Sequence, residues 1–337
     1  MSEPTAGTGP VRWGILGTGA IAASFAADLT HTSSGAVVAV GSRSQSSADQ
    51  FADRFNIPHR HATYEALVAD NDVDVVYVAT PHPMHHLNAL LALNAGRSVL
   101  VEKAFAMTAA QAREMVATAR HQGLFLMEAM WPRFLPHTAE VRRLLAERAL
   151  GEVVSVTADF GSWFPRDPSS RLFAPELGGG ALLDLGVYVV SFASMVLGTP
   201  DRVVSLVDPA MTGVDAQTSI LLGHPNGAHA VLTCTSSANS PRHAAIIGTD
   251  ARIEFNDGFP GPAPFTLITR SGERARHEVT DPSHALRHQA DEVARCLRSG
   301  LLESPLMPLD ETVAIMETMD RVLSHSSQGS SRTPPPA

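Results

Sequence analysis

Three glycines fall within the first six residues of GILGTGAIAASF, residues 14–25. The segment begins inside VRWGIL (11–16), a short apolar run typical of a buried parallel strand. It ends inside AIAASFAADL (20–29), in which the apolar residues follow helical spacing. The residues between, GTGAIA (17–22), fit the pattern G-x-G-x-x-A at a strand-to-helix junction, which is typical of a dinucleotide-binding turn.

Each small residue of this turn has its own physical task. Gly17 permits the tight turn, Gly19 lets a pyrophosphate approach the backbone, and Ala22 lets the helix pack closely on the strand. The free N–H groups and partial positive charge at the helix N-terminus then attract the phosphates. The alternative is a strand–helix turn without a ligand, and the alternating elements that follow favour the dinucleotide. The predicted cofactor-binding residues of this turn are Gly17, Thr18, Gly19, Ala20 and Ile21.

The first third of the chain continues to alternate between strand and helix patterns. Alternation of this kind predicts a parallel sheet whose connections are right-handed crossovers. The predicted strands cover residues 35–44, 72–81, 98–104 and 125–131, and the predicted helices cover residues 46–55, 85–96 and 108–123.

The pattern changes after about residue 150. Residues 153–161 alternate between apolar and polar side chains, and 217–235 and 243–255 each predict a hairpin. Helices are predicted at 178–198, 285–300 and 309–323. The predicted fold class is therefore α/β: an N-terminal Rossmann domain with a doubly wound parallel sheet, and a C-terminal α+β domain with a large open, mainly antiparallel sheet.

These patterns predict two domains between two disordered ends. A lead covers residues 1–10, the dinucleotide-binding Rossmann domain 11–130, the substrate and oligomerisation domain 131–323, and a tail 324–337. For the last two predicted helices, packing against the first domain is the alternative. An open sheet needs a cover for its second face, and a second subunit supplies one. We therefore expect a homodimer or homotetramer formed through the open sheet.

Composition excludes several classes of partner. The 337 residues are 44% hydrophobic and 18% charged, with a formal net charge of −9, which argues against nucleic acid and anionic membranes. We expect no membrane span, because no run of about 18 apolar residues occurs, and the N-terminus lacks a signal-peptide pattern. Cys234 and Cys296 are expected to be buried, reduced thiols of a cytoplasmic protein. No metal site is predicted.

The end of the second predicted strand indicates which dinucleotide binds. NAD sites usually carry an acidic residue there, which holds the ribose 2′-hydroxyl. This chain has Ser42 and Arg43 instead, and a guanidinium binds a 2′-phosphate that a carboxylate would repel. NADP is therefore favoured and NAD stays possible, since a solvated loop charge is the alternative role for Arg43.

Three further motifs follow along the chain: Thr80-Pro81 with His85, Val101-Glu102-Lys103, and Gly178-Gly179-Gly180 with Asp184 and Gly186. Together they resemble a known family, the Gfo/Idh/MocA oxidoreductases. Their order and spacing match that family from Val11 to about Leu323. Residues 127–134 and 178–188 look most like its branch of dimeric dihydrodiol dehydrogenases and NADP-dependent D-xylose dehydrogenases. The chain departs from the usual family pattern at Ala104, where a proline is common, and at Tyr188, where histidine is common.

The residues and the resemblance together predict a catalytic set of Lys103, Tyr188 and Asp184. Tyr188 moves the substrate proton, although an unperturbed phenol has a pKa of about 10. The Lys103 ammonium lowers that pKa by stabilising the phenolate. Asp184 lies four residues before Tyr188 in a helical pattern, and it orients the substrate or Lys103. The alternatives are a core tyrosine, a surface lysine and a local hydrogen-bonding role for the aspartate.

Further residues are predicted to line the site. For His85 a structural hydrogen bond is the alternative, and for the tryptophan–arginine pair interdomain packing is the alternative. Aromatic side chains in the loop after residue 161 suit a wall for sugars or arene diols. The additional cofactor residues are Thr80, Pro81, His82, His85, Glu102, Lys103, Trp131 and Arg133, and the substrate residues are Trp163, Phe164 and Arg166.

The predicted function is an NADP-dependent oxidoreductase acting on a small molecule. Hydride passes between the nicotinamide and a sugar, vicinal diol or related carbonyl compound. Two alternatives stay open on the same scaffold: a non-catalytic dinucleotide-binding regulator, and an NAD-dependent glycosidase. Retention of both Lys103 and Tyr188 argues against the first, and Ser42-Arg43 argues against the second.

Overall fold

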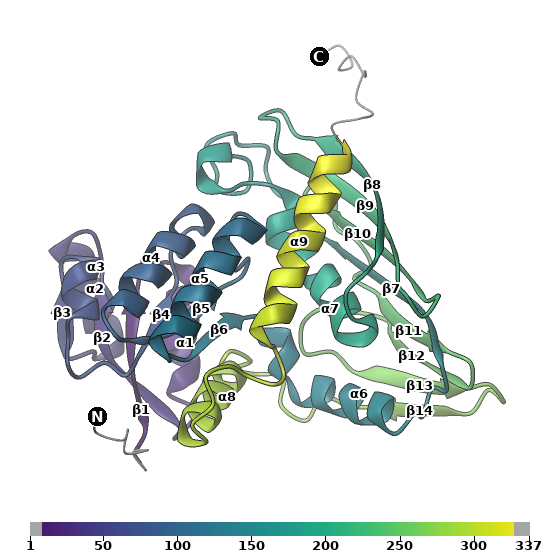
Figure 1. Ribbon diagram of the computed structural model, residues 1–337, viewed down its shortest axis with the longest axis horizontal. Coiled ribbons are helices and arrows are strands. Elements are labelled where there is room, and N and C mark those ends of the chain that lie inside the picture. The colour runs from purple at the N-terminus through teal and green to yellow at the C-terminus, as the bar shows by residue number, and fades with distance from the viewer. Residues whose placement is uncertain (1–8, 327–337) are drawn as a thin grey trace. The chain divides into compact units, whose positions relative to one another are not determined.

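A computed structural model describes residues 9–326 of the chain (Figure 1). The predicted lead at 1–10 and tail at 324–337 fall outside these residues, apart from positions 9, 10 and 324–326. Helix α9 continues to Ser326, past the predicted start of the tail. The chain divides into two compact units: residues up to Arg142 with Val279–Val313, and Arg143–Glu278 with the chain from Ala314.

This division assigns residues 131–142 to the first unit, beyond the predicted boundary at residue 130. It also assigns residues 279–313 to that unit, an option that the sequence left open for the last two predicted helices. Both segments belong there because side chains far apart in the sequence bind one another. Arg133 pairs with Glu311 at 2.6 Å, and Arg142 donates to the carbonyl oxygen of Leu306 at 2.9 Å. A sequence pattern does not reveal such long-range pairs.

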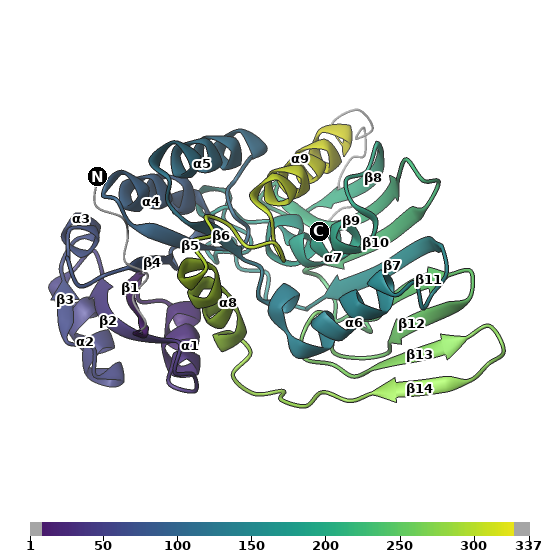
Figure 2. The ribbon, with the colours of Figure 1, turned by 60° about the horizontal axis from the view of Figure 1, so that its bottom comes forward.

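The first unit contains a parallel sheet of six strands in the order β3-β2-β1-β4-β5-β6. The order reverses between β1 and β4, so right-handed crossovers place α1 and α2 on one face and α4 and α5 on the other (Figures 1 and 2). The strands are β1 (Val11–Leu16), β2 (Gly35–Gly41), β3 (His59–His61), β4 (Val75–Val78), β5 (Ser98–Glu102) and β6 (Leu126–Ala129).

Local sequence explains where these helices begin and end. The side chains of Ser44, Thr63 and Thr108 cap helices by accepting from a backbone N–H three residues later. Gly123 ends α5 in the left-handed conformation. The helices are α1 (Ala20–Leu29), α2 (Gln45–Phe55), α3 (Tyr64–Val68), α4 (His82–Asn94), α5 (Ala109–Gln122), η1 (Trp131–Phe134), α6 (Pro136–Ala146), α8 (Arg287–Arg298) and α9 (Leu309–Ser326), of which α6 and α9 pass from one unit to the other.

The second unit contains a sheet of eight strands in the order β14-β13-β12-β11-β7-β10-β9-β8 (Figure 2). Both predicted hairpins are present, and the pairing is antiparallel except between β10 and β7. The strands are β7 (Val153–Gly161), β8 (Arg202–Pro209), β9 (Asp215–Gly223), β10 (His229–Thr235), β11 (Ala244–Gly248), β12 (Ala251–Phe255), β13 (Phe265–Thr269) and β14 (Arg274–His277), and the helical segments are η2 (Pro175–Leu177), η3 (Leu182–Gly186) and α7 (Val187–Leu197).

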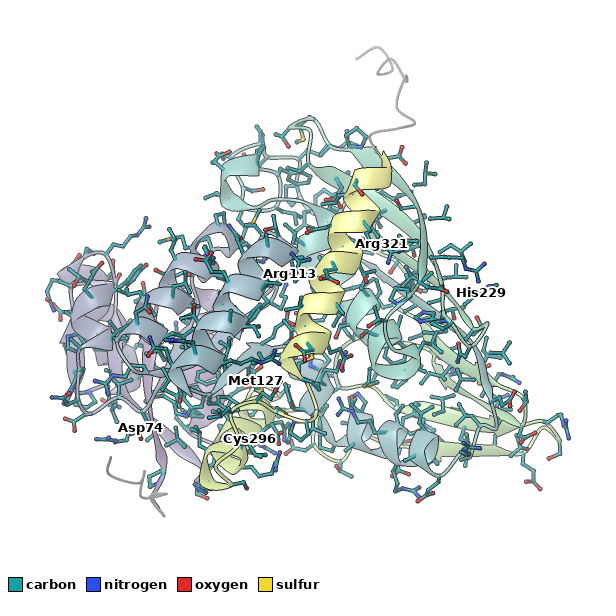
Figure 3. The ribbon with its side chains drawn as sticks, viewed as in Figure 1. Asp74, Arg113, Met127, His229, Cys296 and Arg321 are labelled. Atoms are coloured by element: carbon teal, nitrogen blue, oxygen red, sulfur yellow. The ribbon has the colours of Figure 1, made fainter. Side chains whose placement is uncertain are left out.

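One face of this sheet is covered and the other is bare within the unit. Helix α7 packs on β7 and β10, and the inward side chains of the strands are buried against it. Figure 3 shows His229 projecting from β10 on the opposite side. That outer face carries exposed apolar side chains, namely Val204, Leu206, Leu221, Val231 and Ile247. Val204, Leu221 and Val231 are direct cross-strand neighbours, so they form a continuous apolar row.

One helical run, Pro175–Leu197, is long and apolar enough to cross a membrane by length and composition alone. Its most apolar window is 83% buried inside the protein, which the core helix of a globular domain also shows. Cys234 and Cys296 are both buried free thiols, as expected.

Candidate active site

The turn after β1 has the geometry that its glycines predict. Gly17 has a φ of +111°, and a Cβ there would lie 2.8 Å from the carbonyl oxygen of Ala79. Gly19 is exposed, and a Cβ there would meet no atom within 4 Å. Gly17 is therefore required by the protein backbone, whereas Gly19 leaves open space in front of the N-terminus of α1. This space fits a pyrophosphate that approaches the backbone closely.

The end of β2 presents Ser42 and Arg43 differently. Ser42 is buried, and its N–H donates to the carbonyl oxygen of His61 at 3.0 Å. Arg43 is exposed, and neither of the residues next to it in the sequence is acidic. Burial raises the pKa of the half-buried Tyr64 phenol, and the charge of Arg43 opposes that rise, which places the two side chains near each other. Sequence reasoning did not select Tyr64.

Residues after β4 form a buried polar cluster. The His85 ring is fully buried, with Nδ1 2.8 Å from the Ala104 carbonyl oxygen and Nε2 2.7 Å from that of Thr80. Burial lowers the pKa of His85 to about 4. The ring thus joins the backbone after β4 to the backbone after β5, which is the structural role left open by the sequence. His82 is also buried and lies edge-on to the His85 ring, while Pro81 precedes α4 as its N-cap.

Glu102 and Lys103 lie at the end of β5. Glu102 is 4% exposed, and its Oε1 accepts a short hydrogen bond from the Tyr77 hydroxyl. Its Oε2 accepts from the Lys103 backbone N–H at 3.2 Å. The Lys103 side chain is half-buried, and the Lys103–Ala104 peptide bond is cis. Tyr77, which holds the carboxylate that precedes the lysine, was not found from the sequence.

The composition of the basic residues singles out Lys103. Lys103 is the only lysine among the 25 basic residues of the chain, and the others are all arginine. A compact ammonium therefore occurs once, directly after a strand of the parallel sheet. Lysine and arginine are not interchangeable where a short cation must approach another group or lose a proton.

Trp131 and Arg133 belong to η1, which follows β6. Arg133 is 4% exposed and pairs with Glu311, while Trp131 is half-buried. The ion pair joins η1 to the start of α9 within the first unit. The observed role of Arg133 is thus internal, and its contact with a cofactor stays a prediction.

Glu128, on β6, is a buried acid that sequence reasoning missed. Its Oε1 accepts from the Phe105 backbone N–H at 3.2 Å, two residues after Lys103. Burial raises the pKa of Glu128 to about 7, although the Arg133 charge and the Phe105 hydrogen bond oppose the rise. Glu128 therefore supports the turn that carries the lysine.

In the second unit, Asp184 is held by an arginine. Arg171 donates to both carboxylate oxygens, at 3.0 and 3.1 Å, and Asp184 is 5% exposed. A bidentate pair of this kind is a strong, charge-assisted contact. The sequence placed Asp184 in the site but not its partner Arg171, thirteen positions earlier in an irregular segment.

Tyr188 occupies the first turn of α7. Its ring is half-buried and lies edge-on to Phe160 of β7, with ring centroids 5.6 Å apart. The Arg242 guanidinium lies 5.0 Å from the centre of the same Phe160 ring. Neither Phe160 nor Arg242 was predicted to lie beside the tyrosine.

The three predicted substrate residues follow β7. The side chains of Trp163 and Arg166 are exposed, and that of Phe164 is half-buried. Trp163 is 58% exposed, and its backbone N–H donates to Asn239 Oδ1. The Phe164 backbone N–H donates to the Ser236 carbonyl oxygen. Arg166 lines an open pocket of about 590 Å³. The other residues that line this pocket include Phe173, Asp208, Met211, Gln217 and Ser237.

The parallel sheet gathers most of the predicted cofactor residues at one edge. The glycine turn, Ser42-Arg43, Thr80 and Lys103 each follow the carboxyl end of a strand, and these strands are neighbours in the sheet. Ligands of open α/β sheets bind at this edge, next to the point where strand order reverses.

Comparison with known proteins gives the same answer for both units. Residues 11–130 match the family described as "Oxidoreductase family, NAD-binding Rossmann fold", and residues 138–254 match "GFO/IDH/MocA C-terminal domain". The chain belongs to the GFO/IDH/MocA oxidoreductase family. This confirms the resemblance, the enzyme class and the Rossmann fold expected from the sequence.

Two similar relatives within this family carry the same name. The mouse trans-1,2-dihydrobenzene-1,2-diol dehydrogenase is 39% identical to this GFO/IDH/MocA protein, over 92% of the chain and 95% of the relative. The human protein of the same name is 36% identical, over 93% of the chain and 96% of the relative. These relatives match the dihydrodiol dehydrogenase branch that the sequence resembles.

Solved structures extend the comparison. The 3-ketoreductase KijD10 from Actinomadura kijaniata, in complex with NADP and TDP-benzene, has a TM-score of 0.82 and 27% identity, covering 94% of this chain and 98% of that one. The aldose–aldose oxidoreductase from Caulobacter crescentus has a TM-score of 0.85 and 24% identity, covering 95% and 98%, and supports the fold alone.

Proposed function

We propose that this oxidoreductase is an NADP-dependent dehydrogenase that acts on a vicinal diol, a sugar or a related carbonyl compound. The observation that carries the proposal is the identity of 36–39%, over nearly the whole chain, to trans-1,2-dihydrobenzene-1,2-diol dehydrogenases. A trans-dihydrodiol is therefore the first substrate to test. The NADP-bound 3-ketoreductase KijD10 adds carbonyl compounds to the candidate substrates.

The end of β2 supports NADP as the cofactor. Arg43 is exposed where a 2′-phosphate would lie, and no acidic residue occurs from Val40 to Ser44 to repel it. The guanidinium offers a planar set of donors that suits phosphate. The open space at Gly19 accommodates the pyrophosphate of either dinucleotide.

Tyr188 is the proposed acid/base. NADP held by the glycine turn and Arg43 would supply the hydride chemistry of alcohol oxidation and carbonyl reduction. In oxidation, the Tyr188 phenolate takes the proton of the substrate hydroxyl as the C–H bond breaks. In reduction, the neutral phenol donates that proton to the carbonyl oxygen. Structures of KijD10 variants in which one lysine is replaced by alanine, or one tyrosine by phenylalanine, were also solved with TDP-benzene and NADP.

Lys103 is the proposed partner of the phenolate. Its ammonium is the only one among the side chains of the whole sequence, and it follows β5 at the edge where the glycine turn also lies. Asp184, anchored by Arg171, is proposed to orient the substrate. An anchored carboxylate is suited to hold a hydroxyl in place, since it loses little rotational freedom on binding.

The outer face of the eight-stranded sheet supports an oligomer. The apolar row of Val204, Leu221 and Val231 is continuous and exposed, and a second copy of the chain is the proposed cover.

Replacement of the catalytic pair tests the mechanism. In Tyr188→Phe we expect kcat to fall by at least about 100-fold with NADPH binding retained, because the proton carrier is lost. Lys103→Met should lose at least as much, and Lys103→Arg should not rescue it, since a guanidinium keeps the charge but not the shape of an ammonium. Steady-state kinetics with a trans-dihydrodiol and with a sugar panel measure turnover, and NADPH fluorescence measures binding.

The single lysine allows a direct second measurement. Reductive methylation with ¹³C-formaldehyde labels one lysine side chain, whose NMR signal titrates separately from that of the N-terminal amine. The signal should shift on addition of NADP⁺ in the wild type and should keep that shift in Tyr188→Phe. Near-normal turnover in Tyr188→Phe or Lys103→Met would end the proposed mechanism. Turnover with none of the diols and sugars would end the proposed substrate class.

A further inference from the structure

Three side chains outside the cofactor edge converge on one point of the first unit. His59 Nδ1 lies 2.6 Å from Asp70 Oδ2, and His61 Nε2 lies 2.9 Å from the same oxygen. The three ligand-type atoms all lie within 4.8 Å of one another. The histidines belong to β3 at the free edge of the parallel sheet, and Asp70 follows α3, which packs beside that strand (Figure 1).

The backbone holds these groups in place. His59 and His61 are two apart on a strand, so their side chains project from the same face. Asp70 Oδ1 accepts from the Asp72 backbone N–H at 2.9 Å, which leaves Oδ2 directed at the rings. The Asp70 N–H donates to the Leu67 carbonyl oxygen, and the Asp70 carbonyl oxygen accepts from the Val73 N–H, so the turn is fixed on both sides.

The electrostatics of Asp70 favour a negative charge. Its carboxylate accepts a hydrogen bond from the Asp72 N–H at 2.9 Å, and its Oδ2 lies within hydrogen-bond distance of both histidine rings. Its side chain is 9% exposed, while those of His59 and His61 are 37% and 21% exposed, so an ion has a path from solvent.

We propose that His59, His61 and Asp70 bind one divalent transition-metal ion of the zinc type. Two imidazoles and a carboxylate are the ligands that zinc and its first-row neighbours prefer, and three protein ligands leave a position for water. Zinc bonds of about 2.0–2.2 Å place ligand atoms of a tetrahedron roughly 3.4 Å apart. From their present 2.6 and 2.9 Å, the His59 and His61 nitrogens therefore have to withdraw from Asp70 Oδ2 by about 0.8 and about 0.5 Å as the ion replaces the shared protons.

The proposed metal site uses none of the predicted cofactor residues, although one backbone hydrogen bond connects it to them. The carbonyl oxygen of His61 accepts from the Ser42 N–H, so the metal-bearing strand is joined to the loop that we assign to the 2′-phosphate. Metal binding is nevertheless measurable without any activity of the enzyme, and its failure leaves the proposed function untouched.

Metal titration of the tag-free, full-length protein tests the site. After EDTA treatment and desalting, we expect isothermal titration with ZnCl₂ to show one equivalent, and Co²⁺ to give the visible absorption of a protein-bound ion. His61→Asn and His59→Asn should weaken zinc at least tenfold and abolish the cobalt spectrum. His121→Asn, which removes an exposed histidine at the end of α5, is the matched control and should bind as the wild type does.

A fourth variant separates metal binding from a hydrogen-bonding role. In His61→Cys a thiolate replaces the imidazole as a ligand, but it does not reproduce the hydrogen bond to Asp70. We expect His61→Cys to bind zinc where His61→Asn does not, with both variants giving native circular dichroism. Zinc binding that is equal in wild type and His61→Asn overturns the proposal, and so does a wild type that binds no zinc at all.

Discussion

Strands β4 and β9 contain similar apolar side chains but expose them differently. All four residues of β4 are buried. In β9, Leu221 is 45% exposed, while Ile220 and Leu222 on either side of it are 2% and 1% exposed. The parallel sheet is covered on both faces, whereas the eight-stranded sheet is covered by α7 on one face only.

This difference determines where each unit has room for function. A sheet that is covered on both faces exposes only the ends of its strands, and there the glycine turn, Arg43 and Lys103 lie. A sheet with one free face exposes whole strands, and its outer apolar row suits another protein surface. The first unit is therefore expected to be sensitive to changes at strand ends, and the second to changes on one face.

The largest expected effect comes from a pair of neighbouring substitutions in β9. Ile220→Asp places a carboxylate in the covered face and should lower the free energy of unfolding by more than about 4 kcal/mol. Leu221→Asp places the same group on the bare face and should leave the free energy of unfolding of the subunit within about 1 kcal/mol. Urea unfolding followed by circular dichroism measures both.

Leu221→Asp should also change assembly. Because a charge in the apolar row is desolvated when a second copy covers it, we expect this variant to be monomeric where the wild type is a dimer or tetramer. Light scattering after size-exclusion chromatography gives the mass. A monomeric wild type would contradict the proposed cover, and equal stability losses at positions 220 and 221 would contradict the difference between the faces.

The sequence predicted those parts of the fold that short patterns determine. The bounds of β1, α1 and β7 agree with prediction residue for residue, because an apolar run, a helical pattern and an alternating pattern define each of them. Strand β3 was missed, since its three residues are all polar or charged. The parallel pairing of β10 with β7 was missed because it joins strands about 70 residues apart.

The candidate site follows the same rule. The glycine turn was predictable because one local motif specifies it. The partners of its residues were not, since Tyr77 meets Glu102 and Arg171 meets Asp184 only after the chain has folded. The His59–His61–Asp70 cluster escaped for the same reason, because its third member lies nine positions beyond the second.

Glu128, on β6, is a fully buried acid. Its pKa of about 7 in the folded protein exceeds the usual value of 4.5, so the folded state keeps a proton that the unfolded state loses. The stability that this proton contributes is present below pH 4.5 and is lost as the pH rises to about 7. The loss amounts to up to about 3 kcal/mol at roughly 1.4 kcal/mol per pKa unit.

Glu128→Gln should remove this dependence on pH. We expect the free energy of unfolding of the variant, measured in urea at pH 5.5 and pH 8, to fall by less than that of the wild type over the same range. Glu152→Gln replaces an exposed carboxyl and should behave as the wild type does. Identical pH dependence in Glu128→Gln and wild type would show that burial of this acid does not cause the loss of stability with rising pH. It would also count against the inference that the covered parallel sheet is the more sensitive to a buried charge.

The smallest effect is expected at Arg43, an exposed residue at the end of β2. If its guanidinium binds the 2′-phosphate, Arg43→Ala removes a charge-assisted hydrogen bond worth about 2 kcal/mol. The KM for NADP⁺ should then rise roughly 30-fold, while the KM for NAD⁺, which lacks that phosphate, should change less than twofold. Arg54→Ala removes another exposed guanidinium from the neighbouring helix α2 and should leave both values unchanged. If KM rose equally for NADP⁺ and NAD⁺, Arg43 would not bind the 2′-phosphate. Another residue near the end of β2 would then have to select NADP.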